Sequence, residues 1–167
     1  MDACQASDII SKAPKQRRVP PDDHVARYCN PQRVIRDPNT DTIKGVFPQA
    51  FELRTNKKEL YLSTHWMESF SEENDLQFQG VVAALRKKME VVRPKAAIAK
   101  LNTGCVVRCG AMRGLAIEIR DRSNSHNPGY AGIYGMPLDN SDDLFLAQLA
   151  DECCIEVRGV DEVTDES

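Results

Sequence analysis

The stretch NDLQFQGVVAALRKKMEVV, residues 74–92, decides the fold that this sequence predicts. Its apolar residues recur at steps of three and four, which places them in one stripe along an α-helix of about five turns. They are Phe78, Val81, Val82, Leu85, Met89 and Val92. A helix with one apolar stripe needs a partner for that stripe, and short strand-like segments on both sides of it in the sequence provide one.

Outside this helix, alternation of apolar and polar residues predicts several strands. The segment 24–35 is predicted to be a strand that leads into a turn. Residues 46–53 and 59–65 flank a polar turn and are predicted to form a hairpin. Further strands are expected at residues 96–101, 115–121 and 130–134.

A second amphipathic helix is expected over residues 139–153, with Ser141 as its N-cap. The order of elements is strand, hairpin, helix, strands and helix. The predicted class is therefore α+β, with a small, mostly antiparallel sheet covered on one face by the two amphipathic helices.

Length and charge divide the chain into three parts. The 167 residues suffice for one domain with a core, but not for two of ordinary size. Residues 1–21 are small, polar and basic and end in two prolines, so we expect a flexible basic arm. Residues 22–158 form the predicted single α+β domain, and residues 159–167 form an acidic tail that is expected to fray.

Composition argues against some functional classes. No apolar run approaches the roughly 20 residues that cross a bilayer, and the N-terminus lacks the basic start and apolar core of a secretory signal. We therefore expect a cytoplasmic protein with no membrane partner. The net charge of −3 argues against nucleic-acid binding. The basic start and acidic finish can still steer a charged partner, and the oligomeric state stays open.

Six cysteines raise the question of disulfides and metal sites. In a chain that is not exported they are expected to be reduced thiols, and adjacent Cys153 and Cys154 make a poor disulfide because their side chains diverge. Cys105 and Cys109 would present two thiolates to a metal if this stretch is helical. The favoured interpretation is small buried side chains with no metal and no cofactor, because the other candidate ligands lie singly: His24, Cys29, His65 and His126.

The candidate ligand-binding residues come from the first strand and the predicted hairpin. If those strands are neighbours, an imidazole, a guanidinium and a hydroxyl converge on an anionic ligand. The alternative is that these side chains alternate outward from a half-solvated sheet. The candidates are His24, Arg27, Tyr28, Arg54, Ser63 and His65.

Three positions stand in an order that resembles the mono-ADP-ribosyltransferases: Arg27 on an early strand, Ser63 at the end of a later one, and Glu118 further on. The resemblance implies that the arginine and serine bind NAD and that the glutamate stabilises the positively charged ribose in the transition state. That family has an acidic residue two places before its glutamate, where this chain has Ala116. The implied cleft is formed by His24, Arg27, Ser63 and Glu118.

The function expected first is that of a protein-interaction module or accessory subunit with a protein partner. No catalytic motif is evident, and the two termini carry opposite charge. The NAD-using enzyme is the alternative, so whether the chain is catalytic stays open. Aromatic residues of the kind that anchor interfaces are present at Tyr28, Tyr61, Trp66, Tyr130 and Tyr134.

Overall fold

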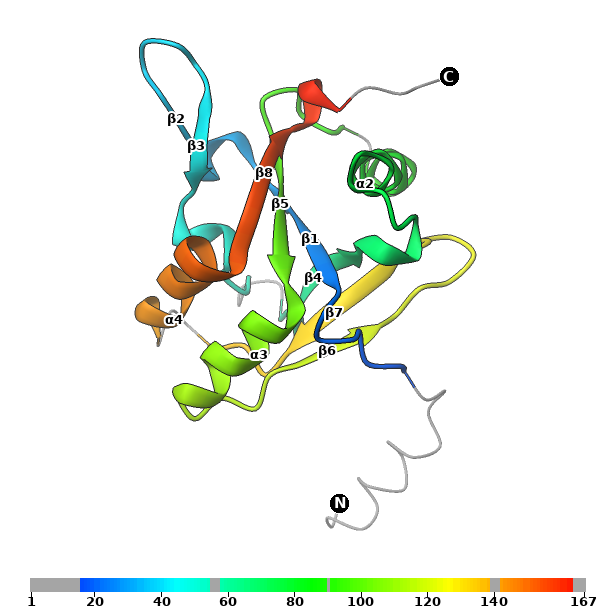
Figure 1. The fold of residues 1–167 in the computed structure, drawn as a ribbon, viewed down its shortest axis with the longest axis vertical. Helices are drawn as coiled ribbons and strands as arrows, with labels where there is room; N and C mark the ends of the chain where they lie inside the picture. The colour runs from blue at the N-terminus through cyan, green and yellow to red at the C-terminus, as the bar shows by residue number, and fades with distance from the viewer. Residues whose placement is uncertain (1–15, 55–57, 90, 139–141, 164–167) are drawn as a thin grey trace.

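The computed structural model describes residues 16–54, 58–89, 91–138 and 142–163 (Figure 1). Six strands form an antiparallel sheet in the order β6-β7-β4-β1-β5-β8. A two-stranded sheet of β2 and β3 lies beside β8. The predicted α+β class with a mostly antiparallel sheet is confirmed. In chain order the strands are β1 His24–Cys29, β2 Val34–Arg36, β3 Ile43–Val46, β4 Tyr61–Trp66, β5 Ala97–Asn102, β6 Glu118–Asp121, β7 Tyr130–Tyr134 and β8 Cys154–Gly159.

Helices and helical turns connect the strands. A π-helical turn, η5 Leu149–Cys153, continues the last α-helix and leads directly into β8. None of the helices within the described ranges combines the length and the apolar character that a membrane span requires. The α-helices are α2 Asn74–Lys88, α3 Thr103–Met112 and α4 Asp143–Gln148. The 3-10 turns are η1 Pro31–Arg33, η2 Pro48–Phe51, η4 Met67–Ser69 and η6 Val160–Glu162.

The helices pack on opposite faces of the large sheet. α2 buries Phe78 and Leu85 in a cluster that includes Ala26 of β1. The preceding residue, Val25, belongs to a second cluster with Phe145 of α4 and residues of α3. Because successive residues of a strand point to opposite faces, α2 covers one face, and α3 and α4 cover the other. The sequence analysis had placed both amphipathic helices on one face, since it did not recognise that β1 and β5 are buried on both sides.

The apolar stripe of α2 lies where its spacing predicts. Phe78 is fully buried and Leu85 is 7% exposed, both against the sheet. The helix stops at Lys88 because Met89 adopts extended backbone, and the half-buried Met89 packs on the same cluster. The predicted helix is therefore confirmed, with an end four residues earlier than expected.

Polar contacts fix the start of α2 to the sheet. Lys100 of β5 is buried, and its ammonium donates to Asn74 Oδ1 at 2.6 Å and Gln77 Oε1 at 3.0 Å. The amide of Asn74 donates in turn to Glu156 Oε1 of β8 at 2.9 Å. A buried ammonium is tolerated only when acceptors surround it, so these contacts hold the helix over β5 and β8.

Two local predictions were wrong. The expected hairpin of residues 46–53 and 59–65 does not form, because β4 pairs with β1 and β7. Residues 48–51 form η2 instead, which starts at Pro48 and buries Phe51. The strand β8 at residues 154–159 was not predicted. In this strand the apolar Ile155 is exposed, whereas the charged Glu156 and Arg158 are half-buried.

Local capping explains where the helices of the other face begin. The Asn102 side chain accepts a hydrogen bond from Cys105 N at 2.9 Å and caps α3, which makes the stretch CVVRC helical. Asp142 caps α4 by accepting from Phe145 N at 3.0 Å. The predicted cap, Ser141, lies outside the described residues. Both caps satisfy amides that the helix itself cannot pair.

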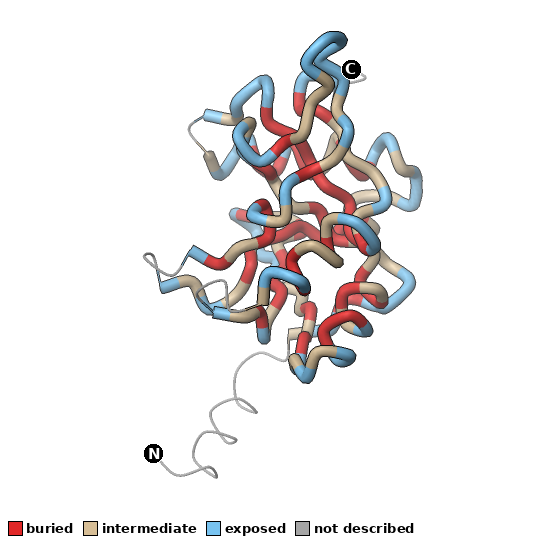
Figure 2. The backbone as a smooth tube through the Cα atoms, turned by 90° about the vertical axis from the view of Figure 1, so that its left-hand side faces the viewer, coloured by how far each residue is buried: buried red, intermediate tan, exposed pale blue. Residues whose placement is uncertain are grey.

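Segments next to the two chain ends pack on the domain. Val19 is buried, and its amide donates to Ile119 O at 2.9 Å. Val160 is also buried, and its amide donates to Ala96 O at 2.9 Å. The buried backbone runs along the strands and the inner sides of the helices, while the outer loops are exposed (Figure 2). Residues 1–15 of the predicted arm and 164–167 of the predicted tail lie outside the described ranges.

Candidate functional site

One half of a sheet face has no helix of the described residues over it. The cluster beneath α2 contains residues of β1 and β5, but none of its described members comes from β4, β6 or β7. Ala26 of β1 pairs with His65 of β4, so His65 points to the α2 side of the sheet. Alternation then places Ser63 and Tyr61 on that side as well. The same face continues over β7 and β6 without a helix above it.

The register of the strands brings aromatic and charged side chains together there. Tyr61 pairs with Tyr134 across β4 and β7, and Tyr134 pairs with Glu118 of β6. Gly132 pairs with Arg120. We call this surface the tyrosine face and define it by its five half-buried aromatic and basic residues, which are Tyr61, Tyr130, Tyr134, Arg120 and Arg122.

The tyrosine rings of this face pack against one another. The ring centroids of Tyr61 and Tyr134 are 5.1 Å apart, and those of Tyr61 and Tyr130 are 6.1 Å apart at an interplanar angle of 69°. These spacings are in the range in which aromatic pairs attract each other. Gly132 lies beneath Tyr61, and a Cβ atom at this position would be 2.6 Å from the ring. The glycine therefore makes room for the central ring of the face.

Two arginines stack on the rings. The guanidinium carbon of Arg122 is 4.6 Å from the centre of the Tyr61 ring, and that of Arg120 is 5.1 Å from the centre of the Tyr134 ring. Arg122 also donates a hydrogen bond to the Tyr134 hydroxyl. A guanidinium that stacks through its face keeps N–H groups at its edge for an acceptor. The face thus combines apolar ring surface with outward-directed donors.

Hydroxyl groups are linked along the same surface. The hydroxyls of Ser63 and Tyr130 are 2.9 Å apart, and the Tyr130 hydroxyl donates to Tyr61 Oη at 3.2 Å. Burial raises the pKa of Tyr130, and the contact with Ser63 lowers it in part. The hydroxyl of Tyr130 therefore stays protonated at neutral pH and acts as a hydrogen-bonding group.

Two of the predicted ligand-binding residues, Arg27 of β1 and Ser63 of β4, are in contact through the backbone of Ser63. The half-buried Arg27 lies where β1 and β4 separate, and it donates from Nε to Ala50 O and from Nη1 to Ser63 O, both at 3.0 Å. Burial lowers the pKa of Arg27, and among the smaller effects of nearby groups Glu59 raises it and Arg54 lowers it. The guanidinium of Arg27 is directed at backbone carbonyls, which is a structural arrangement.

Arg54 is held by the loop that precedes β4. Its Nε donates to Glu59 Oε1 at 2.8 Å, and its backbone amide donates to the same oxygen at 2.7 Å. Burial of Glu59 raises the pKa of its carboxyl group, but the contacts with Arg54 outweigh this effect and lower it.

The remaining predicted residues have other partners. His24 Nδ1 lies 2.6 Å from Glu68 Oε2, at the start of η4. His65 is buried, and its Nε2 lies 3.1 Å from Asn127 Oδ1. The hydroxyl of Tyr28 accepts from the backbone amide of Arg93 at 3.3 Å. The six predicted residues therefore do not converge on one ligand.

Glu118 lies on a different part of the sheet from Arg27. Strands β7 and β4 stand between β6, which carries Glu118, and β1, which carries Arg27. Three strand spacings of about 4.8 Å separate the two backbones by about 14 Å. Glu118 pairs with Arg120 and with Arg18, and its pKa is lowered by its hydrogen bond from Arg120 first and then by the two charges. Of the residues proposed for the ribosyltransferase cleft, Arg27 and Ser63 are in contact. The ribosyltransferase alternative stays a prediction.

The arginines of the tyrosine face were missed by the sequence analysis, and a signal for them was present. In EIRDR the residues 118, 120 and 122 alternate, and in YAGIY the residues 130, 132 and 134 alternate. Each set points to one face of its strand. What the sequence does not contain is that β7 pairs with both β4 and β6, which places both sets on the same face as Tyr61.

Three cysteines form the group that could hold a metal. Cys105 and Cys109 are one turn apart on α3, and Cys153 comes from η5. A disulfide joins Cys105 and Cys153, whose Cα atoms are 5.4 Å apart, and Cys109 is free. The prediction that all cysteines are reduced was therefore wrong for this pair. Packing of α3 on η5 brings together residues that are 48 positions apart.

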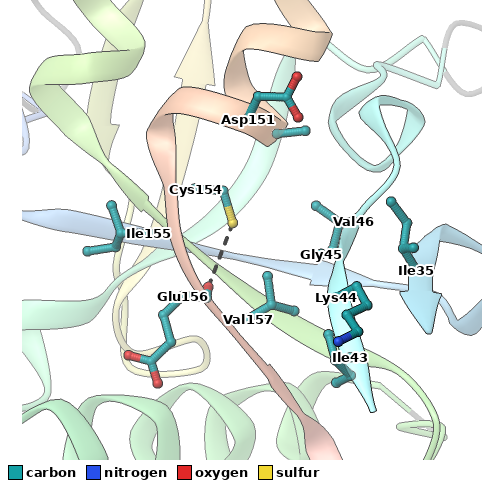
Figure 3. Close-up of a pocket in the computed structure, with 11 residues that line it drawn as sticks. Ile35, Ile43, Lys44, Gly45, Val46, Asp151, Cys154, Ile155, Glu156 and Val157 are labelled. Atoms are coloured by element: carbon teal, nitrogen blue, oxygen red, sulfur yellow. Dashed lines mark hydrogen bonds between the residues drawn. The ribbon is translucent and has the colours of Figure 1, made fainter. Parts of the chain in front are cut away.

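Of the two other described cysteines, Cys29 fits the prediction of a small buried side chain, whereas Cys154 is only half-buried. Cys29 is buried, and burial raises its pKa to about 12. Cys154 diverges from Cys153, as expected for neighbours, and lines a hollow of about 420 Å³ between β3 and β8 (Figure 3). Its thiol donates to Glu156 O at 3.7 Å, and burial raises its pKa to about 11. None of the predicted ligand-binding residues lines this hollow.

Comparison with known proteins found no match to this chain among family models, curated proteins or solved structures. The chemistry of the tyrosine face and of the cysteine group is therefore the basis on which a function can be inferred.

Proposed function

We propose that this chain is a protein-interaction module that binds an acidic segment of a partner protein on the tyrosine face. The observation that carries the proposal is the set of three tyrosines on an open sheet face with two arginines stacked on their rings. Tyrosine and arginine are the residue types that most often dominate binding energy in protein interfaces. Half-buried, mutually packed rings lose little conformational freedom on binding.

Charge favours an acidic partner. Within the described residues, Arg122 bonds to tyrosine hydroxyls rather than to a carboxylate, so its charge is not neutralised in the free chain. Arg120 shares Glu118 with Arg18, which leaves two guanidinium groups for one carboxylate. An aspartate or glutamate of a partner can accept the remaining N–H groups in a charge-assisted hydrogen bond.

The partner is expected to meet the side chains of the face and not to extend the sheet. The free edge of β6 is already covered, since Val19 N donates to Ile119 O and Asp121 N donates to Arg17 O. An incoming strand has no row of unpaired backbone groups to join at this edge. Recognition therefore depends on ring contacts and guanidinium groups.

The test is a binding titration with labelled peptides, followed by fluorescence anisotropy. The probe is a short peptide of alternating glutamate and phenylalanine, and its control has lysine in place of glutamate. We expect the acidic peptide to bind and the basic one not to bind. Replacement Arg122→Gln should weaken binding about tenfold, as expected for loss of one charged hydrogen bond.

The matched control is Arg33→Gln, which removes an exposed arginine from η1 and should leave binding unchanged. Equal affinity for both peptides, or equal loss in the two variants, would contradict the proposal. A short oligothymidine is included as a third probe. If it binds through the tyrosines while the acidic peptide does not, the face is a stacking surface for single-stranded nucleic acid, and the proposal is wrong.

A further inference from the structure

Three sulfur atoms from two separate segments meet where α3 packs on η5. α3 contributes Cys105 and Cys109 from one helical face, and the π-helical turn contributes Cys153. Their sulfur atoms all lie within 4.8 Å of one another. A π-helical turn is rare and is frequently found at functional sites, because it directs side chains differently from a regular helix. Here it brings Cys153 and the adjacent Glu152 to Cys109.

The distances around Cys109 match the edges of a tetrahedral metal site. Cys109 Sγ is 3.8 Å from Cys153 Sγ and 3.6 Å from Glu152 Oε2. With zinc–sulfur bonds of about 2.3 Å, two sulfur ligands are about 3.8 Å apart. With a zinc–oxygen bond of about 2.0 Å, a sulfur and an oxygen ligand are about 3.5 Å apart. Both distances to Cys109 fit ligands of one ion, and the three sulfur atoms alone form the group that is mutually within 4.8 Å, so the Glu152 carboxylate has to turn further toward Cys105 and Cys153 to complete the site.

We propose that the reduced form of this cluster binds one zinc ion through the thiolates of Cys105, Cys109 and Cys153 and the carboxylate of Glu152, and that the Cys105–Cys153 disulfide excludes the metal. Thiolates select zinc over harder cations such as magnesium and calcium. The oxidised and the metal-bound states are mutually exclusive because they use the same two sulfur atoms. The cluster is then a metal site that opens and closes with the redox state of the chain.

The chemistry balances with a dithiol as the reductant. Two electrons and two protons convert the disulfide to the thiols of Cys105 and Cys153, and the dithiol becomes a disulfide. Zinc then binds three thiols and one carboxylate, and three protons are released. The bound site carries a net charge of minus two, from one divalent cation and four anionic ligands.

The surroundings suit such a site. Two arginines flank Cys109 along α3: Arg108 precedes it, and Arg113 lies one turn beyond it. Arg113 is already paired with Asp142 at 3.2 Å, so Arg108 is the nearer source of positive charge for the bound site. Glu152 is exposed and Cys105 is half-buried, so an ion reaches the cluster without unfolding of the core.

Cobalt(II) is the probe for the first test, because a tetrahedral cobalt–thiolate site absorbs strongly in the visible range. The full chain is titrated with Co²⁺ after reduction by a dithiol and removal of the reductant under nitrogen. We expect one cobalt per chain, displaced by one zinc. The disulfide form of the same protein should show no such absorption, and equal binding by both forms would overturn the proposal.

Variants identify the ligands. Cys109→Ser should abolish stoichiometric binding, whereas the matched control Cys154→Ser, one residue beyond the cluster, should bind as the parent does. Glu152→Gln should weaken binding about tenfold or more, as expected for loss of a charged ligand. Unchanged binding in Cys109→Ser would overturn the site, and unchanged affinity in Glu152→Gln would overturn the role of that carboxylate.

A second measurement needs no substitution, so it does not depend on whether the variants fold. The reduced chain is alkylated with iodoacetamide with and without zinc, and the modified peptides are quantified by mass spectrometry. Zinc should protect Cys105 and Cys109 and leave the rate at Cys154 unchanged. If zinc gives no protection while Cys109 exchanges into the disulfide, the cluster is a thiol-exchange site, and the metal proposal is overturned.

Discussion

The ring of Tyr61 occupies the space directly above Gly132: a Cβ atom added at Gly132 would lie 2.6 Å from Tyr61 Cδ2. Both residues sit on paired strands, since Gly132 is the cross-strand partner of Ser63, two positions from Tyr61. This relationship sets the arrangement of the tyrosine face. The ring packs down on the backbone of β7 and thereby reaches both Tyr130 and Tyr134.

Replacement Gly132→Ala is therefore expected to lower the free energy of unfolding by about 1–3 kcal/mol, because the added methyl group displaces the Tyr61 ring. Urea unfolding measures the loss. In a Tyr61→Ala background the same replacement should cost much less, since the ring that it meets is gone. An equal cost in both backgrounds would show that the two residues do not interact.

The guanidinium of the half-buried Arg27 joins β1 to β4 where the two strands separate. Its replacement measures how much this contact stabilises the fold. Replacement Arg27→Met removes the N–H groups that donate to Ala50 O and Ser63 O. We expect it to lower the free energy of unfolding by about 2–4 kcal/mol. Arg27→Lys keeps the charge but cannot serve both carbonyls, so its loss should be intermediate. Exposed Arg33 provides the control, because Arg33→Met should change stability by less than about 0.5 kcal/mol. A similar loss in both Met variants, measured by urea unfolding, would disprove this role.

Because His65 is buried, we expect the free energy of unfolding to depend on pH. Burial lowers its pKa in the folded chain, with a smaller opposing effect from Asn127. The unfolded chain therefore binds a proton at a higher pH than the folded chain does, and stability is full above about pH 6.5 and falls as the pH drops below that value.

The change can be measured by urea unfolding at pH 7.5 and pH 5.5, where the parent should lose stability and His65→Gln should lose less. Carboxylates with lowered pKa, such as Glu118, also lose stabilisation in acid. Because the pKa of such a carboxylate is lowered from its ordinary value, which is already acidic, it titrates below this window. An identical loss in the parent and the variant would rule out the contribution of His65.

Because of its disulfide, we expect the free energy of unfolding of the chain to depend on whether a reductant is present. The bond between Cys105 and Cys153 closes a loop of 48 positions, for which chain entropy gives a stabilisation of about 4 kcal/mol, with 2–4 kcal/mol typical of measurements. Cys105→Ser should therefore lower stability by this amount without reductant and by much less with reductant. Cys154→Ser is the control and should respond equally in both conditions. No difference for Cys105→Ser between the two conditions would mean that the bond does not form.

Much of the secondary structure follows from local pattern. The apolar stripe that starts at Phe78 predicts α2 because its spacing matches the helical repeat. The alternation of residues in β6 and β7 matches the two-residue repeat of a strand. Helix α3 was not predicted because Gly104 and Gly110 weaken its helical propensity. The caps Asn102 and Asp142 determine where α3 and α4 begin, and both are local signals that the sequence contains.

The candidate site could be predicted only in part. Of the residues expected to lie together, Arg27 contacts Ser63 through the Ser63 backbone carbonyl, and its guanidinium is turned toward backbone carbonyls. The histidines of the same set have partners elsewhere in the described chain. A strand pattern shows which residues share a face, whereas it does not show which strands are neighbours.

The sequence by itself determined the α+β class and the residues that α2 buries, because both depend on spacing along a single segment. Only the tertiary structure decided the strand order, which places β7 between β4 and β6 and leaves the tyrosine face without a helix from the described residues. It also decided the meeting of Cys109 with Cys153, since α3 and η5 pack together across the chain. The physical reason is that pairing and packing join residues far apart in sequence, and local periodicity carries no information about such partners.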